Sequence, residues 1–224
     1  MSSDKRLFRC GIIGFGAIGP THAAAIQQLP DEAELLAVAD VIPERAQSAA
    51  SRFGVKRIYR DHAELIADKD IDVVSICTPS GMHADMGVAA LEAGKHVVVE
   101  KPMDVSLEAC DRLIAAAEKS GKKLSIISQH RFDHATQVVK NAIESGQLGK
   151  IILADAAVKW WRTQEYYDSG DWRGTWKWDG GGALMNQGIH TVDVLQYLVG
   201  GVRRLWAQTR TAGHTGIEVE DVAV

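Results

Sequence analysis

The sequence has 224 residues, of which 46% are hydrophobic and 24% are charged, a composition typical of globular proteins and unlike that of disordered chains. Its formal net charge of -4 gives no electrostatic reason to expect a nucleic acid or an anionic membrane surface as a partner. Three scattered cysteines, no apolar run of membrane-spanning length and no signal-peptide core favour a reducing, cytoplasmic location, with no disulfides and no metal site.

Short apolar segments alternate with helical patterns in the first half of the chain. Strands are expected over residues 7–13, 34–40, 71–77, 96–99 and 124–128. Helices are expected over residues 18–29, 43–54 and 82–93, and from residue 106 onward. Near-continuous apolar strands separated by helices predict a parallel sheet covered on both faces. Residues 1–124 are therefore expected to form one α/β domain.

The regular alternation stops near residue 124. The expected elements that follow are a helix over 131–145, a long strand over 150–161, a helix over 182–198 and a strand-like run over 217–224. This irregular order predicts a second, α+β domain over residues 125–224. The last run alternates apolar and polar residues, and it is expected to pair with residues 150–161 or with residues 202–211. Because that run has no protected edge, the second domain is expected to be part of a larger one.

A glycine-rich turn lies between the first expected strand and the first expected helix. Gly14 allows a tight turn, Gly16 lets the backbone approach a pyrophosphate, and Gly19 permits close helix–strand packing. The N-terminus of the following helix offers N–H groups and a positive dipole to phosphates. The alternative is an ordinary turn, but the strand–turn–helix context favours dinucleotide binding. The residues of this motif are Gly14, Phe15, Gly16, Ala17, Ile18 and Gly19.

Asp40 follows about 20 residues later, at the end of the second expected strand. A carboxylate at this place accepts hydrogen bonds from the ribose hydroxyls of NAD and repels the 2′-phosphate of NADP. Neither Val41 nor Ile42 is an arginine that could hold such a phosphate. We therefore expect NAD as cofactor, the alternative being a carboxylate that only caps a turn or helix.

Two polar segments follow later strands of the same sheet. Thr78 and Pro79, with His83 shortly after, come after one strand, and Glu100-Lys101-Pro102 follows the next. Such loops face the ligand crevice at the carboxyl edge of a parallel sheet. A lysine there can donate a hydrogen bond to a substrate hydroxyl. From these residues alone, a helix-capping His83 and a solvated surface lysine remain the alternatives.

Asn186, His190 and Asp193 have the spacing of one helix face. A histidine there can act as a general acid or base near neutral pH. The alternative is a histidine that is hydrogen-bonded to Asp193 or Asn186 inside a packed helix.

Five of the six tryptophans lie between residues 160 and 178, among tyrosines and arginines. Aromatic faces stack on the C–H faces of sugars, and arginine donors bind hydroxyls or anions. We expect most of these rings to pack the domain or a subunit contact, with one or two near a substrate. The candidate substrate-binding residues of this segment are Arg162, Tyr167, Trp172 and Arg173.

Taken together, these motifs in this order resemble the Gfo/Idh/MocA family, of the glucose–fructose oxidoreductase and inositol dehydrogenase type. The resemblance implies a Rossmann domain followed by an α+β domain with an open, mostly antiparallel sheet. That sheet often forms the oligomer interface, so a homo-oligomer is expected. Family members are commonly longer than this chain, which fits the expectation of a partial second domain.

The resemblance also implies roles for individual residues. Lys101 matches the active-site lysine of the family, with a cis peptide bond before Pro102 aiming it into the crevice, and His190 matches the catalytic histidine. Asn186 stands where many members have an aspartate, and a neutral amide can orient substrate but cannot act as a base. Asn186 and Asp193 are thus expected to bind substrate. The expected cofactor-binding residues outside the glycine-rich turn are Asp40, Thr78, Pro79, His83, Glu100 and Lys101.

The function implied is that of an NAD-dependent dehydrogenase oxidising a secondary alcohol of a sugar, nucleotide sugar or cyclitol to a ketone. His190 would remove the hydroxyl proton while Lys101 hydrogen-bonds the same oxygen. One alternative is an NAD-dependent glycosidase that oxidises its substrate only transiently. Another is an NAD-binding sugar sensor without chemistry, against which the presence of both Lys101 and His190 argues.

Overall fold

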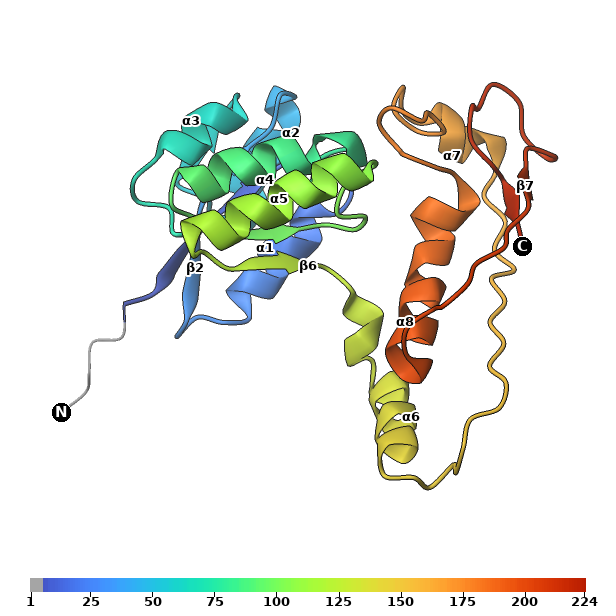
Figure 1. The fold of residues 1–224 in the computed structure, drawn as a ribbon. Coiled ribbons are helices and arrows are strands. Elements are labelled where there is room, and N and C mark those ends of the chain that lie inside the picture. Colours follow the sequence, from blue (N-terminus) through green and yellow to red (C-terminus); the bar gives the residue numbers. More distant parts are fainter. Residues whose placement is uncertain (1–5) are drawn as a thin grey trace. The chain divides into compact units, whose positions relative to one another are not determined.

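The computed structural model describes residues 6–224, and the chain divides into two compact units between Ile127 and Ser128 (Figure 1). The division falls a few residues after the boundary expected at residue 124. None of the helices in the described range has both the length and the apolar character that a bilayer crossing needs.

The first unit is built on a six-stranded parallel sheet in the order β3-β2-β1-β4-β5-β6. The chain enters at β1 in the centre, runs outward through β2 to β3, and then crosses back to β4 on the other side of β1. This reversal creates a switch point between β1 and β4, where ligands bind in open α/β sheets. The strands are β1 (Phe8–Ile13), β2 (Ala33–Ala39), β3 (Arg57–Tyr59), β4 (Val73–Ile76), β5 (His96–Val99) and β6 (Leu124–Ile126).

Helices cover both faces of this sheet, as the apolar strands predicted. Ile12 and Ile13 of β1 belong to different hydrophobic clusters, because successive side chains of a strand point to opposite faces. The cluster around Ile13 includes residues of α3, α4 and α5, and that around Ile12 includes residues of α1 and α2; α4 and α5 run side by side (Figure 1). The helices are α1 (Gly19–Gln27), α2 (Pro43–Phe53), α3 (His62–Ala67), the 3-10 turn η1 (Ser80–Met82), α4 (His83–Glu92) and α5 (Leu107–Ser120).

Local signals set most of these helix ends. Pro43 begins α2, and Gly54 ends it in the left-handed conformation that an L residue adopts only at a cost. The Ser106 side chain accepts a hydrogen bond from the Ala109 N–H and so caps α5. β3 and α3 were not expected from the sequence, because they are too short to show a clear period.

The second unit consists mainly of helices. Its α6 packs against α8, and the Lys140 ammonium of α6 donates to the Tyr197 carbonyl of α8 at 2.9 Å. The expected helix over 182–198 is present, but its first part is a π-helix. The elements are η2 (Gln129–Phe132), α6 (His134–Glu144), α7 (Gln164–Asp168), the π-helix η3 (Ala183–Gly188), α8 (Ile189–Val199), β7 (Thr209–Arg210) and β8 (Val222–Ala223).

The long strand expected over residues 150–161 is wrong. This segment is irregular and pairs with no strand of the described chain (Figure 1). Ile152 and Leu153 are 83% and 84% exposed, so the alternating pattern here has no partner to pack against. A β-like pattern becomes a strand only when a neighbouring strand accepts its backbone hydrogen bonds.

The strand-like run over residues 217–224 forms only a short strand, β8. It pairs antiparallel with β7, with Thr209 opposite Ala223 and Arg210 opposite Val222. The pairing with residues 202–211 is therefore confirmed, and the alternative pairing with residues 150–161 is not. Overall, the α/β class, with a parallel first sheet and an antiparallel second one, is confirmed.

Candidate active site

The carboxyl ends of four neighbouring strands bring the expected first-unit residues to one edge of the sheet. The glycine-rich turn follows β1, Asp40 follows β2, and Thr78 and Lys101 come after β4 and β5. These loops are far apart in the sequence, and the parallel sheet collects them because every strand points the same way.

The shape of the glycine-rich turn fits a dinucleotide. Gly14 has a φ of +87°, and a Cβ atom there would lie 2.7 Å from the Cys77 carbonyl oxygen. A Cβ on Gly19 would lie 2.5 Å from the Gly14 carbonyl oxygen. Gly16 is different, because its Cβ would meet only the Arg45 guanidinium, at 3.7 Å. Packing thus requires two of the glycines, while the third leaves open backbone for a pyrophosphate.

Arg45 was missed by the sequence analysis. It lies in the first turn of α2, beyond the two residues after Asp40 that were inspected for an arginine. Its guanidinium adds a positive charge beside Gly16, which favours a phosphate group at this edge.

Asp40 joins β2 to the glycine-rich turn. The side chain is buried, one carboxylate oxygen accepts from the Phe15 N–H at 2.6 Å, and the other accepts from the Ile42 N–H at 2.8 Å. A carboxylate has about four lone-pair sites, so these two bonds leave acceptor capacity for ribose hydroxyls. The ribose contact stays a prediction, and the capping role that was its alternative is present as well.

His83 connects two of the crevice loops. The ring is 1% exposed, with Nδ1 2.8 Å from the Pro102 carbonyl oxygen and Nε2 2.9 Å from the Thr78 carbonyl oxygen. Burial lowers the pKa of His83, although both backbone contacts act to raise it. The structure thus makes His83 a brace between the loops, and its expected contact with the cofactor stays a prediction.

Replacing His83 by phenylalanine should test this brace. The ring volume is kept, but the carbonyls of Thr78 and Pro102 lose their nitrogen partners, so we expect the free energy of unfolding to fall by about 2 kcal/mol. Urea denaturation measures the change. The control is His62→Phe, because the His62 side chain is 42% exposed. Equal, small losses in both variants would contradict the role of His83.

The Glu100-Lys101-Pro102 segment contacts His83 through Pro102, and it also contacts α1 through Glu100. The peptide bond between Lys101 and Pro102 is cis, as expected. One Glu100 oxygen lies 3.0 Å from His22 Nε2, and the other accepts from the Lys101 N–H at 3.1 Å. Burial alone would raise the pKa of Glu100, but the hydrogen bond and charge of His22 hold it below its usual value. The backbone of Lys101 is therefore tied to α1, the helix that follows the glycine-rich turn.

His22 was also missed by the sequence analysis. The available signal was its place in the first turn of the helix that begins at Gly19, and its contact with Glu100 shows that the side chain lies at the same edge. The pairing itself joins residues from opposite ends of the domain sequence, so only the fold reveals it.

In the second unit, the expected face of α8 and η3 is present, with different partners for each residue. Asn186 accepts from the Tyr166 hydroxyl at 3.2 Å and donates to Asp179 at 2.8 Å. The His190 ring lies edge-on to His130, with 5.0 Å between centroids. His190 and Lys101 belong to different units, so their shared action on one oxygen stays a proposal.

Asp193 forms an ion pair with Arg131. The carboxylate accepts two hydrogen bonds from the guanidinium, at 2.8 and 2.5 Å, and these lower the pKa of Asp193. This bidentate pair joins η2 to α8 and accounts for the carboxylate without a substrate. A substrate contact of Asp193 stays a prediction that the geometry does not favour.

The aromatic segment contains one tyrosine in the interior and one between arginines. Tyr167 is buried and packs against His214, with 4.7 Å between ring centroids, so packing explains this candidate substrate residue. The guanidinium carbons of Arg162 and Arg173 lie 4.7 and 4.2 Å from the centroid of the Tyr166 ring. Arg173 also lies over Trp172, at 4.5 Å. The arginines and Trp172 thus form a cluster around Tyr166.

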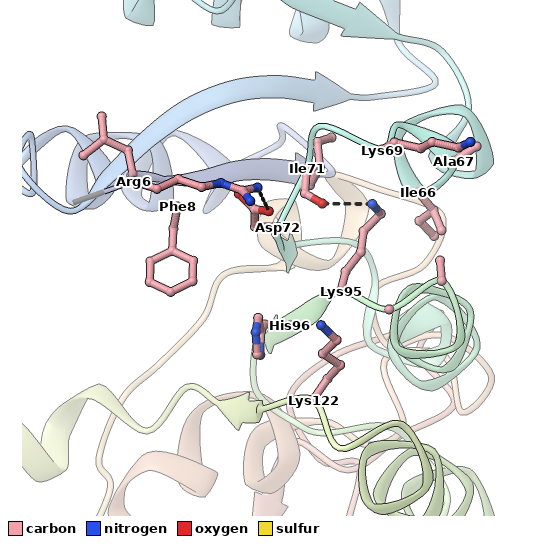
Figure 2. A pocket seen from close by; sticks show the side chains of 13 residues that line it. Arg6, Phe8, Ile66, Ala67, Lys69, Ile71, Asp72, Lys95, His96 and Lys122 are labelled. Atoms are coloured by element: carbon pink, nitrogen blue, oxygen red, sulfur yellow. Dashed lines mark hydrogen bonds and ion pairs between the residues drawn. The ribbon is translucent and has the colours of Figure 1, made fainter. Parts of the chain in front are cut away.

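A separate cavity of about 630 Å³ lies at the opposite, amino edge of the first sheet (Figure 2). It is lined by the starts of β1 and β5, and Arg6, Asp72 and Lys95 of its lining form contacts within the unit. Lys95 donates to the carbonyls of Asp68 and Ile71 at 2.7 and 2.9 Å, and Arg6 pairs with Asp72 at 2.6 Å. These interactions stabilise the loop before β4.

The strand order, with a glycine-rich turn at the switch point, defines the first unit as a dinucleotide-binding Rossmann domain. Residues 8–128 match the family model described as "Oxidoreductase family, NAD-binding Rossmann fold", and residues 136–224 match "GFO/IDH/MocA C-terminal domain". The chain belongs to the GFO/IDH/MocA oxidoreductase family, and NAD is the cofactor of its first domain.

Several relatives of the chain are named as dehydrogenases. It is 37% identical over 147 residues to inositol 2-dehydrogenase of Salmonella typhimurium, covering 65% of this chain and 44% of the relative. It is 31% identical over 192 residues to scyllo-inositol 2-dehydrogenase (NAD(+)) of Bacillus subtilis, covering 86% and 54%. The chain thus spans about half the length of these relatives.

Among solved structures, the WlbA dehydrogenase of Bordetella pertussis, in complex with NADH and UDP-GlcNAcA, is similar throughout. The two are 40% identical with a TM-score of 0.93, and the match covers 97% of this chain and 66% of the other.

Proposed function

We propose that this protein is an NAD-dependent dehydrogenase that oxidises a secondary alcohol of a sugar, nucleotide sugar or cyclitol to a ketone. The observation that carries the proposal is the placement of Lys101. Its loop is held by Glu100 on one side and by His83 on the other, at the edge of the sheet that also carries the glycine-rich turn. A lysine whose backbone is held at this edge suits hydrogen bonding to a reacting alcohol oxygen.

The first unit would hold NAD with residues already described. The backbone at Gly16 and the N-terminus of α1 would bind the pyrophosphate, with Arg45 adding charge, and the free acceptor sites of Asp40 would bind the ribose hydroxyls. Bound NAD supplies the hydride acceptor for the oxidation.

Proton transfer falls to residues of the chain itself. A neutral His190 takes the proton of the substrate hydroxyl as the C–H hydrogen leaves as hydride and the carbonyl forms. Lys101 donates a hydrogen bond to the same oxygen. Asn186 is one turn before His190 and, as a neutral amide, orients the substrate without acting as a base.

The names of the relatives support this class of substrates without selecting one member. Two relatives are inositol dehydrogenases, and the WlbA dehydrogenase was solved with a nucleotide sugar. A homo-oligomer formed through the second unit stays a prediction.

Cofactor choice tests the role of Asp40. NADH should bind at least about tenfold more tightly than NADPH, because a 2′-phosphate would approach the Asp40 carboxylate. Dissociation constants follow from NADH and NADPH fluorescence titrations. The Asp40→Asn variant keeps the side-chain size and removes the charge, so it should reduce the preference. Equal or tighter binding of NADPH by the unaltered protein would contradict the assignment.

Turnover separates the dehydrogenase from its alternatives. The chain is incubated with NAD and a panel of cyclitols, sugars and nucleotide sugars, and NADH formation is measured by absorbance. One NADH per molecule of ketone supports the proposal. Release of an aglycone with only catalytic NAD would indicate the glycosidase, and binding of NADH and sugar without turnover would indicate the sensor.

A further inference from the structure

We propose that Arg162 and Arg173, here called the arginine pair, bind an anionic group of the substrate, a carboxylate or a phosphate. This inference rests on the proposed function and narrows its substrates to acidic sugars or nucleotide sugars. The arginine pair lies within the second unit and flanks α7, the short helix that carries Tyr166.

Aromatic faces hold both guanidinium groups in place. Besides their shared contact with Tyr166, Arg162 lies over Trp160 with its guanidinium carbon 4.4 Å from the ring centroid, and Arg173 lies over Trp172 at 4.5 Å. Stacking uses the flat faces of a guanidinium and leaves its N–H groups at the edge able to donate. Two such groups on one ring form a preorganised set of donors with two positive charges.

Neither Arg162 nor Arg173 belongs to an ion pair seen in the described part of the second unit. The ion pairs of the second unit join other residues, namely His130 with Asp133, Arg131 with Asp193, Lys140 with Glu144 and His214 with Asp221. The Nε of Arg162 is buried without a hydrogen-bond partner, and the Nε of Arg173 donates only to the Ser169 hydroxyl, at 3.1 Å. A buried donor without a partner is uncommon in folded proteins, and it shows that the contacts of Arg162 inside the chain leave part of its hydrogen-bonding capacity unused.

Three carboxylates of this unit accept hydrogen bonds from backbone N–H groups. Asp179 accepts from the Gly174 N–H and from the Asn186 amide, Glu218 from the Trp176 N–H, and Glu220 from two N–H groups at the start of η3. Arg131 shows the contrasting case, because it has its own carboxylate in Asp193. The arginine pair, unlike Arg131, is therefore able to give an incoming anion charge-assisted hydrogen bonds.

The arginine pair is also linked to the helix face that carries His190. The hydroxyl of Tyr166 donates to Asn186 at 3.2 Å, and His190 follows Asn186 by about one turn. An anion held at Tyr166 would thus fix a substrate next to the residues expected to orient and deprotonate its hydroxyl. The arginine pair would therefore determine which substrate binds. It would take no part in the transfer of the proton or the hydride.

Four probes separate the possible anions. UDP-GlcNAcA carries both a carboxylate and a diphosphate, UDP-N-acetylglucosamine only the diphosphate, glucuronate only the carboxylate, and myo-inositol neither. Binding is measured by calorimetry on the full chain with saturating NADH. Arg162→Gln and Arg173→Gln should each weaken UDP-GlcNAcA binding by about 10- to 100-fold, the value of one or two hydrogen bonds to a charged group. The dissociation constant of NADH should not change.

Matched variants guard against a general loss of structure. Lys177→Gln removes another cation from the same segment, one that lies over Trp178 at 4.4 Å, and it should leave all four probes unaffected. Arg173→Lys keeps the charge but loses the planar fork, so it should recover part of the binding. Thermal melts of each variant show whether the fold is retained.

The pattern across the probes decides the outcome. If the arginine variants bind glucuronate more weakly but bind UDP-N-acetylglucosamine as before, the arginine pair binds a carboxylate. If they bind UDP-N-acetylglucosamine more weakly but glucuronate as before, it binds the diphosphate. If a folded arginine variant binds UDP-GlcNAcA as the unaltered chain does, or the unaltered chain binds no acidic probe, the inference is overturned. In that case, NADH formation from neutral alcohols would still support the proposed dehydrogenase activity. The absence of turnover with any alcohol would count against the dehydrogenase activity and against the anion-binding role of the arginine pair.

Discussion

Replacing His190 by alanine should lower turnover by about 10²- to 10⁴-fold, the usual contribution of a positioned general base. The dissociation constant of NADH should stay the same, because His190 belongs to the second unit and the expected NAD contacts belong to the first. Steady-state rates and NADH fluorescence titrations measure the two quantities. A fall in turnover without a change in cofactor affinity identifies an interaction made during the reaction.

The matched control is His130→Ala. His130 lies edge-on to His190, and its side chain is 45% exposed and pairs with Asp133. Its loss should change turnover little. Near-native turnover of His190→Ala would show that His190 only packs the helix, and equal losses in the two variants would point to a disturbed structure around both rings. Lys101→Met should also lower turnover, because the alcohol oxygen would lose its charged donor.

Gly14→Ala should destabilise the protein by about 2–4 kcal/mol and abolish NADH binding. The new Cβ would lie 2.7 Å from the Cys77 carbonyl oxygen, at a φ of +87° where side chains are strained. The turn must shift to relieve the contact, and the backbone that would receive the pyrophosphate shifts with it. Urea denaturation and NADH titration measure the two effects.

Gly54→Ala is the control for the backbone strain alone. Gly54 has a φ of +67°, but a Cβ there would meet nothing within 4 Å. This variant should cost only about 1–2 kcal/mol, the penalty of the left-handed conformation, and leave NADH binding unchanged. Similar losses of stability and of NADH affinity in both variants would refute a special packing requirement at Gly14.

The contacts of His22 and His83 on either side of Lys101 connect the expected cofactor site to the loop that carries the lysine. His22 belongs to the helix whose N-terminus would face the pyrophosphate, and it contacts Glu100 directly before Lys101. His83 holds the following residue from α4. These contacts hold the backbone of Lys101 on both sides without the cofactor, which lowers the entropic cost of aligning the reacting groups.

Much of the first unit could be predicted from the sequence, because its signals are local. Alternating faces of β1, a proline at the start of α2 and a glycine after its end act within a few residues. The glycine-rich turn needs its glycines for steric reasons that a strand–turn–helix context already implies. The resemblance to the family added the roles proposed for Lys101 and His190 and the cis bond before Pro102, and the cis bond is present.

The tertiary structure alone decided the interactions between residues distant in sequence. It showed that His83 joins the Thr78 and Pro102 carbonyls, and that Asp193 is held by Arg131. It also showed that residues 150–161 form no strand in the described chain, although their pattern resembles one. Periodicity reports which side of a segment can be buried, but a strand, a buried brace or an ion pair exists only when the fold brings its partner within hydrogen-bond distance.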